Sequence, residues 1–282
     1  PIPEAARAEI DRLLASGDLF RYTAPENAPV ALLEREFAKL LGTKYALAVS
    51  SCSAALFLSL LGLGLKPGTK VLIPGFTFAA VPSAVIHANC RPVLVEVGQN
   101  YRIDLEDFAA RLTDEVGAVI ISHMRGHTSD MDAIMALCDA AGVPVVEDAA
   151  HSLGTLWNGR NIGTLGRVGC FSFQSYKLIN SGEGGILVTD DADLVARAVI
   201  MSGAYEHNWA KHIGGSDRRW RPRLPAGRTS CRSTTCACRT SPPRSSGRNC
   251  PSLPAGSAMA APITITSPRR WTARPGWMCR RP

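Results

Sequence analysis

Short apolar runs alternate with amphipathic stretches between residues 4 and 201, and few architectures are compatible with this order of elements. Strands separated by helices pair mainly in parallel, with the helices covering both faces of the sheet. The runs that predict strands are residues 45–49, 70–73, 91–97, 116–121, 143–148, 170–173 and 185–189. Helical apolar spacing predicts helices over residues 4–14, 30–41, 105–112, 130–140 and 191–201, and two more that end near Leu61 and His87. We therefore expect an α/β protein with three αβα layers and a mainly parallel sheet, in which the Gly-rich residues 157–166 are irregular.

One lysine lies among aromatic and small residues, shortly before a glycine-rich turn. Lys177 follows Phe171-Ser-Phe-Gln-Ser-Tyr176 and precedes Gly182-Glu-Gly-Gly185. An amine that loses its solvation also loses its proton more readily, so Lys177 can form a Schiff base. Considered alone, it is better explained as a surface lysine whose stem covers an apolar strand.

An acidic pair at the end of a predicted strand supplies a partner for this lysine. The apolar run from Val143 ends in Glu147 and Asp148, at the carboxyl edge where open α/β sheets bind ligands. An acid that keeps a pyridine nitrogen protonated and a lysine that holds an aldehyde are the two groups a pyridoxal phosphate enzyme needs. Taken singly, Asp148 could cap the next helix and His151 could be a structural histidine.

Three segments together carry a more specific pattern, namely Asp148-Ala-Ala-His151, Ser172-Phe-Gln-Ser-Tyr-Lys177 and Gly182-Glu-Gly-Gly185. They resemble the DegT/DnrJ/EryC1/StrS family of sugar aminotransferases, which have the pyridoxal phosphate fold type I, with a large domain like that of aspartate aminotransferase. The similarity runs from about Gly17 to about His212. Gln174 stands where many members carry histidine. The family's dehydratases carry histidine in place of the lysine, so Lys177 favours transamination.

A strand-to-helix turn at Ser51-Cys52-Ser53 is a candidate phosphate site. Backbone N–H groups and the positive end of the helix dipole suit an anion there, although ordinary serine capping also explains the turn. The family usually has Ser-Gly-Thr at this turn, so Cys52 is a departure. The resemblance places the ring-stacking residue at Phe78, where a core phenylalanine is the alternative. The cofactor-binding residues it implies are Ser51, Cys52, Ser53, Phe78, Asp148, His151, Ser172, Gln174 and Lys177, with Lys177 and Asp148 catalytic.

The resemblance also implies the reaction and its partners. Pyridoxal 5′-phosphate would carry an amino group from an amino acid, Glu or Gln, to a nucleotide-linked keto-sugar or a cyclitol ketone, in a homodimer whose interface completes the active site. A pyridoxal phosphate-dependent sugar dehydratase and a catalytically inactive family member remain alternatives.

The segment Ser122-His-Met-Arg-Gly-His127 is expected to be a loop at a strand's carboxyl end. Its two histidines and Arg125 suggest a metal site, but no third protein ligand has a matching spacing. We expect a polar loop on the substrate side and no metal.

The chain divides by composition near residue 217. Residues 218–282 hold fourteen Arg and no Lys, Asp or Glu, which leaves seventeen basic residues against all twenty-four acidic ones in residues 1–217. A basic tail is typical of nucleic-acid binding. This tail, however, also has ten of the nineteen Pro and five of the nine Cys and no helical apolar period, as GC-rich coding DNA gives in a wrong frame.

The genetic code is compatible with that explanation. In the alternative frame, suitable third bases turn residues 230–246 into a product with an Asn-x-Arg-Met stretch, which resembles the segment that the family carries after its lysine. We hypothesise a frameshift near Asp217. Residues 1–217 would then be the cofactor-binding large domain, residues 218–282 would be out of frame and disordered, and the C-terminal small domain would be missing or scrambled. We expect no nucleic-acid partner, and Cys231, Cys236 and Cys238 match no ordinary zinc spacing.

The other cysteines bear on the compartment. Cys52, Cys90, Cys138 and Cys170 lie in apolar or small-residue surroundings without paired spacing, which favours reduced thiols and a cytoplasmic protein. There is no signal peptide and no apolar run long enough to cross a bilayer, so we expect no membrane partner.

Overall fold

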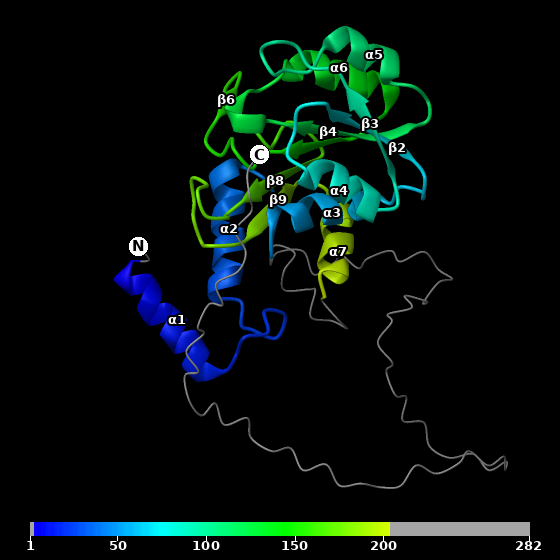
Figure 1. Ribbon diagram of the computed structural model, residues 1–282. Helices are drawn as coiled ribbons and strands as arrows, with labels where there is room; N and C mark the ends of the chain where they lie inside the picture. Colours follow the sequence, from blue (N-terminus) through cyan, green and yellow to red (C-terminus); the bar gives the residue numbers. More distant parts are fainter. Residues whose placement is uncertain (1–2, 204–282) are drawn as a thin grey trace, which may run out of the picture. The chain divides into compact units, whose positions relative to one another are not determined.

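A seven-stranded sheet forms the centre of the computed structural model, which describes residues 3–203 (Figure 1). Its strands are β1 (Tyr45–Val49), β2 (Lys70–Pro74), β3 (Arg91–Val95), β4 (Val116–Ser122), β5 (Val145–Asp148), β8 (Val168–Ser172) and β9 (Gly185–Thr189). They lie in the order β1-β9-β8-β5-β4-β2-β3. Neighbours from β8 to β3 are parallel, which confirms the mainly parallel sheet.

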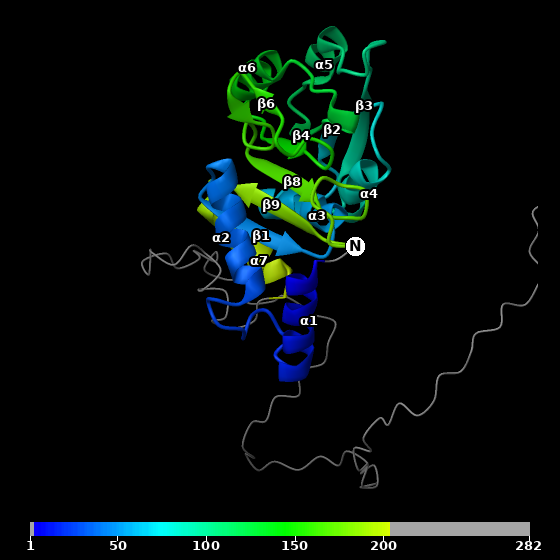
Figure 2. The same ribbon diagram turned by 90° about the vertical axis from the view of Figure 1, so that its left-hand side faces the viewer.

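Strand β9 is the exception, because it is antiparallel to both β8 and β1. The segment between β8 and β9 contains no helix. A parallel return usually needs a helix in the crossover, and residues 173–184 contain none, so the chain turns back antiparallel. This connection carries Lys177, and Figure 2 shows the strands β8 and β9 that it joins.

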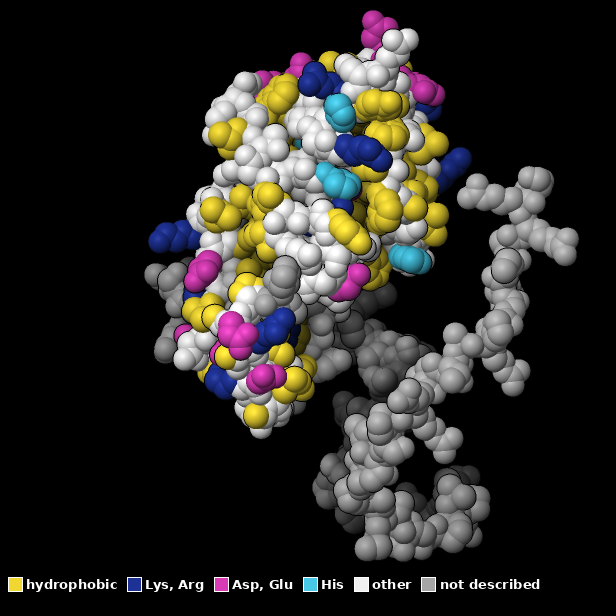
Figure 3. Space-filling view, turned by 60° about the vertical axis from the view of Figure 1, so that its left-hand side comes forward, with side chains coloured by type: hydrophobic (Ala, Val, Ile, Leu, Met, Phe, Trp, Pro, Cys, Tyr) yellow, Lys and Arg dark blue, Asp and Glu magenta, His cyan; other side chains and the backbone are white. Residues whose placement is uncertain are grey.

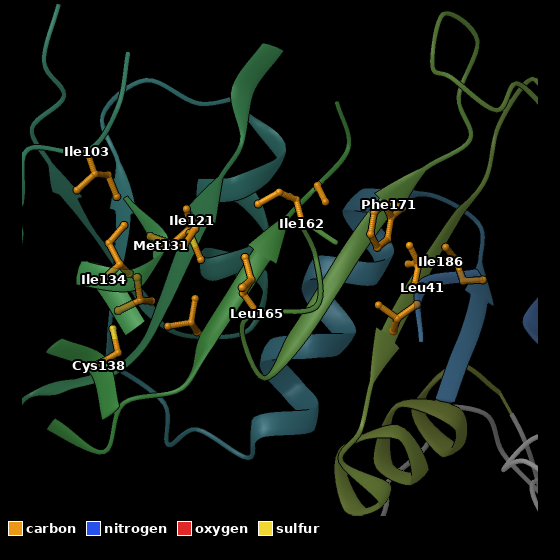
Figure 4. Packing of buried hydrophobic residues seen from close by; sticks show 14 of the residues in the cluster. Leu41, Ile103, Ile121, Met131, Ile134, Cys138, Ile162, Leu165, Phe171 and Ile186 are labelled. Atoms are coloured by element: carbon orange, nitrogen blue, oxygen red, sulfur yellow. The ribbon is translucent and has the colours of Figure 1, made fainter. Parts of the chain in front are cut away.

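Seven helices of the described part accompany the sheet: α1 (Glu4–Ser16), α2 (Pro29–Leu41), α3 (Cys52–Leu63), α4 (Ala80–His87), α5 (Leu105–Arg111), α6 (Met131–Ala141) and α7 (Ala192–Met201). One buried cluster joins α3, α4 and α7 to one face of the sheet. A second joins α2, α5 and α6 to the other face (Figure 4). Residues alternate between these clusters along every strand of the sheet except the edge strand β3, as Ile120 and Ile121 do, so the expected three layers are confirmed.

The expectation that residues 157–166 are irregular is wrong at one point. Strands β6 (Leu156–Trp157) and β7 (Arg160–Asn161) form a small antiparallel hairpin. Asn158 and Gly159, which connect them, have φ of 47° and 80°. Asn-Gly with two positive φ values is the preferred two-residue hairpin turn, and this signal was present in the sequence.

The predictions for residues 218–282, including the change of frame and Cys231, Cys236 and Cys238, lie outside the described residues. Between residues 3 and 203, no helix is long and apolar enough to cross a membrane. The cysteines of this part, Cys52, Cys90, Cys138 and Cys170, are free thiols.

Candidate active site

A cavity of about 540 Å³ opens where β5 and β8 end and α3 begins. Its volume lies within the range of about 300–1,000 Å³ that is usual for small-molecule sites. The cavity is lined by all nine residues that were predicted from the sequence to bind the cofactor: Ser51, Cys52, Ser53, Phe78, Asp148, His151, Ser172, Gln174 and Lys177. The lysine amine and the carboxylate therefore face one space rather than opposite sides of the sheet.

Another cavity of about 550 Å³, lined by Arg167 and Asp190–Asp193 among others, lies where β8 begins and β9 ends. We place the active site in the first cavity because open α/β sheets bind ligands at the carboxyl ends of their parallel strands.

Asp148 ends β5 and is only 6% exposed. Its Oδ2 accepts a hydrogen bond from Ser122 Oγ at 2.9 Å, and its Oδ1 accepts one from Ala150 N at 3.1 Å. The Cys52 thiol donates a longer one to Oδ1, at 3.8 Å. No helix follows Asp148 directly, so it does not cap one as the alternative interpretation required.

The environment of Cys52 favours the protonated thiol. Burial, followed by the nearby Asp148 carboxylate, raises the pKa of Cys52 well above its ordinary value. The thiol is therefore a hydrogen-bond donor to Asp148 rather than a thiolate nucleophile.

Glu147 precedes Asp148 and has a different role. It is fully buried, and its Oε1 accepts hydrogen bonds from Leu165 N and Gly166 N, both at 2.7 Å. Its Oε2 accepts one from Gly163 N at 2.8 Å and lies 3.1 Å from His123 Nε2. These contacts are with backbone amides or a buried ring. Glu147 therefore anchors residues 163–166 and His123 to the end of β5.

His123 corrects the expectation for the Ser122–His127 loop. The segment does turn, with a short 3-10 helix at Met124–Gly126, but His123 is fully buried against Glu147 and does not face the substrate side. Arg125 lines the cavity and has a φ of 54°, an uncommon conformation that often accompanies functional sites. No group of three or more His, Cys, Asp or Glu that could hold a metal occurs in the part of the chain that the structure describes.

Lys177 lies beside His151. Its Nζ is 2.7 Å from His151 Nε2. Burial, and secondarily the positive charge of Lys177, lowers the pKa of His151 from 6.5, although Asp148 acts in the opposite direction. A neutral ring can accept a hydrogen bond at Nε2, so we assign Lys177 Nζ as the donor and His151 as the acceptor.

The beginning of α3 supports both interpretations of its serines. Ser51 Oγ accepts a hydrogen bond from Ala54 N at 3.0 Å and so caps the helix. The amides of Cys52 and Ser53 have no acceptor among residues 3–203, as is usual in a first turn, and both residues line the cavity. Gly185 makes this arrangement possible, because a Cβ there would lie 2.4 Å from Cys52 N.

Phe78 is 61% exposed and lines the cavity, so the alternative of a core phenylalanine is wrong. The sequence placed Ser122 and Arg125 in the expected substrate-side loop without an individual role, and it assigned no role to Glu183, which also lines the cavity. No spacing in the sequence indicated which loop side chains turn inward.

The residues present fit pyridoxal phosphate. An amine, a buried carboxylate, an exposed aromatic ring and the free amides of a helix N-terminus border one cavity, and these groups suit its aldehyde, ring nitrogen, flat ring and phosphate.

Comparisons with known proteins identify the family of this chain. Residues 4–218 match the model of the DegT/DnrJ/EryC1/StrS aminotransferase family. The spore coat polysaccharide biosynthesis protein SpsC of Bacillus subtilis (strain 168) is 38% identical over 195 residues, which are 69% of this chain and 49% of SpsC.

Two solved structures extend the likeness. That of 3-amino-5-hydroxybenzoic acid synthase matches with a TM-score of 0.68 and 33% identity, over 79% of this chain and 56% of that one. That of E. coli GDP-4-keto-6-deoxy-D-mannose-3-dehydratase with bound hydrated PLP matches with a TM-score of 0.61 and 27% identity, over 68% and 50%. The fold is thus that of pyridoxal phosphate enzymes of fold type I. The chain spans about half the length of the curated relatives it matches, as the 49% coverage of SpsC illustrates.

Proposed function

The chain belongs to the DegT/DnrJ/EryC1/StrS aminotransferase family, and from this membership we propose that it is a pyridoxal 5′-phosphate-dependent transaminase of sugar biosynthesis. The observation that carries the proposal is the single cavity lined by both Lys177 and Asp148. Amino transfer needs an amine and an acid at one cofactor, and the described residues provide both.

The proposed cofactor contacts divide by chemistry. Ser51, Cys52 and Ser53, with Ser172 across the cavity, offer the phosphate backbone amides and hydroxyls. Phe78 offers its face to the ring. When bound, pyridoxal phosphate supplies an electron sink for the carbon that loses a proton.

Asp148 is proposed to keep the ring nitrogen protonated. Its carboxylate is buried and accepts hydrogen bonds at both oxygens, which stabilises the charged form. His151 and Gln174 also border the cavity and are proposed to contact the polar groups of the cofactor.

Lys177 is proposed to hold the cofactor covalently through Nζ and, once released by the donor amino acid, to move a proton at the reacting carbon. The neighbouring His151 orients this amine in the structure through the 2.7 Å contact. Because His151 favours the neutral form, its Nε2 can accept a hydrogen bond from Nζ without placing a second positive charge beside the lysine.

The substrates are proposed to be an amino acid donor, Glu or Gln, and a nucleotide-linked keto-sugar or cyclitol ketone. Arg125 on the cavity wall supports an anionic substrate, because a guanidinium binds a carboxylate or phosphate in a bidentate manner. The similarity to SpsC, a protein of polysaccharide biosynthesis, supports a sugar acceptor.

A homodimer is proposed as the working form. Large hydrophobic side chains are exposed around the lysine loop, with Tyr176 100%, Leu178 78% and Ile179 41% exposed. The face drawn in Figure 3 carries many such yellow side chains beside histidines. Contiguous exposed apolar surface often marks a protein interface.

Dehydration is the main alternative, because the structural neighbours include dehydratases. Lys177 favours transfer instead, since the family's dehydratases carry histidine in place of the lysine. A product assay separates the two, because only transfer forms a new amine from the ketone.

Borohydride reduction of the purified chain with pyridoxal phosphate, followed by peptide mass spectrometry, tests the proposal. We expect a pyridoxyl group on the peptide that contains Lys177, and loss of this group and of turnover in Lys177→Ala. Lys70→Ala is the control, because Lys70 pairs with Glu115 away from the cavity. Labelling that persists in Lys177→Ala would exclude the assignment.

We further propose that residues 1–217 form the cofactor-binding domain and that the reading frame changes near Asp217. The match to the family model ends at residue 218, which supports this boundary. Sequencing of the coding DNA tests it: an open alternative frame with family character is expected, and a closed one would rule the frameshift out.

A further inference from the structure

We infer that Ser122 and Cys52 are positioning residues that hold the Asp148 carboxylate in the orientation and charge state that the cofactor's ring nitrogen requires. This inference rests on the proposed function, because it assigns a role relative to the same cofactor. This positioning role was not predicted from the sequence for either side chain.

Asp148 already accepts three hydrogen bonds within the described residues. An ionised carboxylate accepts at about four sites. Ser122 Oγ occupies one on Oδ2 at 2.9 Å, and Ala150 N and Cys52 Sγ occupy sites on Oδ1 at 3.1 and 3.8 Å. The Asp148 carboxylate can therefore accept a further hydrogen bond. Its side chain lines the cavity, where a ring N–H can reach it.

Ser122 ends β4, and in the parallel pairing of β4 with β5 it stands directly opposite Asp148. Side chains opposite each other in a sheet project from the same face, so the pairing of the two strands is sufficient to bring the Ser122 hydroxyl to the Asp148 carboxylate. Ser122 is 8% exposed and is not part of the cavity lining, so its effect on a cofactor passes through Asp148.

The Ser122 hydroxyl also helps to keep the Asp148 carboxylate ionised. Asp148 is 6% exposed, and a buried carboxylate stays ionised only where hydrogen-bond donors or positive charges replace its water. Removing the Ser122 hydroxyl would make the carboxylate a stronger base. The proton shared with the ring nitrogen would then move toward Asp148, and the ring would lose part of its positive charge.

Cys52 acts from the other side. The family usually has glycine at this position of the turn, and a glycine has no side chain that could reach Asp148. In this chain the neutral thiol supplies a donor to Oδ1. Thiols are weak donors, so we expect a smaller contribution from Cys52 than from Ser122.

The test compares Ser122→Ala with Ser122→Thr, which keeps the hydroxyl, and with Ser152→Ala. Ser152 is 1% exposed and its hydroxyl donates to the His123 carbonyl at 3.2 Å, so its loss removes a buried hydroxyl bond that does not involve Asp148. The first measurement is the dissociation constant of pyridoxal phosphate from the full chain. The second is the nitrogen-15 chemical shift of bound cofactor labelled at the ring nitrogen.

We expect Ser122→Ala to weaken cofactor binding on the order of tenfold, the change that loss of one hydrogen bond to a charged group gives. Its nitrogen-15 shift should move toward that of an unprotonated pyridine. Ser122→Thr should restore both values, Ser152→Ala should leave the nitrogen shift unchanged, and Cys52→Ala should move it in the same direction as Ser122→Ala by less.

Two results would overturn the inference in distinguishable ways. If the wild-type chain binds the cofactor and Ser122→Ala, with native circular dichroism, keeps the wild-type nitrogen shift and affinity, the positioning role is wrong and the proposed function stands. If the wild-type chain binds no cofactor, the proposed function fails and this inference fails with it. Should Ser122→Ala not fold, Cys52→Ala, on the solvent side of the carboxylate, decides by the same two measurements.

Discussion

Glu147→Gln should destabilise the protein more than almost any other change of one atom. The carboxylate accepts hydrogen bonds from three backbone amides and contacts His123, and the residue is fully buried. A glutamine has one oxygen and one amino group. In one orientation the amino group faces the N–H groups of Leu165 and Gly166, and in the other it faces Gly163 and His123.

The magnitude follows from that geometry. Two of the four contacts are lost in either orientation, and a hydrogen bond to a charged group contributes about 1.5–3 kcal/mol. We therefore expect the free energy of unfolding to fall by about 3–6 kcal/mol. His123 can relieve one contact by moving its proton to Nδ1, which has no partner within the described residues, and the lower end of the range then applies.

Urea denaturation of the full chain, followed by far-ultraviolet circular dichroism, measures this change. Glu115→Gln is the matched control, because Glu115 is largely exposed and pairs with Lys70 at the surface, where an ion pair contributes about 0–1 kcal/mol. The reasoning would be refuted if Glu147→Gln unfolded within about 1 kcal/mol of the wild type, as Glu115→Gln should.

Two further predictions concern the cavity. Gly185→Ala places a Cβ 2.4 Å from Cys52 N, so it should lower the free energy of unfolding by about 1–3 kcal/mol and weaken cofactor binding. Gly98→Ala is the control, because the nearest atom to its new Cβ is a side-chain oxygen. Equal effects of the two substitutions would contradict the contact between Gly185 and the start of α3. His151 should titrate below pH 6.5 in an NMR experiment on the cofactor-free protein, and its pKa should rise in Lys177→Ala. Because the unfolded chain binds that proton at higher pH, stability should fall as the pH drops below 6.5, and a His151 titration above 6.5 would refute the assignment.

The sequence predicted the sheet and the cavity through signals that act locally. The apolar run before Glu147 requires a strand buried on both faces, and the acidic pair at its end then falls at the carboxyl edge. Lys177 and Ser53 reach the same edge because β8 and β1 end there too. Once the order of parallel strands is set, residues far apart in the chain meet without any further information.

What could not be predicted depends on register. A shift of one residue between β4 and β5 would turn Ser122 away from Asp148 and bring His123 toward the cavity, and both residues are compatible with either face. The expectation that His123 faces the substrate failed for this reason. The contact of Cys52 with Asp148 likewise requires the position of α3 over the sheet, which α7 and Gly185 determine from much later in the chain.

The location of these supports in the chain separates two parts of the proposed activity. Every residue proposed to hold the cofactor lies between Ser51 and Lys177, and the glycine that admits α3 follows at residue 185, all before the proposed change of frame near Asp217. All the residues of this chain that are proposed to hold the cofactor are therefore encoded before that point. The resemblance assigns the completion of the active site to a partner subunit and to a small domain encoded later, so cofactor binding and amino transfer have to be measured separately. Binding without transfer would be the consequence of an intact Lys177 cavity joined to a scrambled continuation, rather than evidence against the cavity.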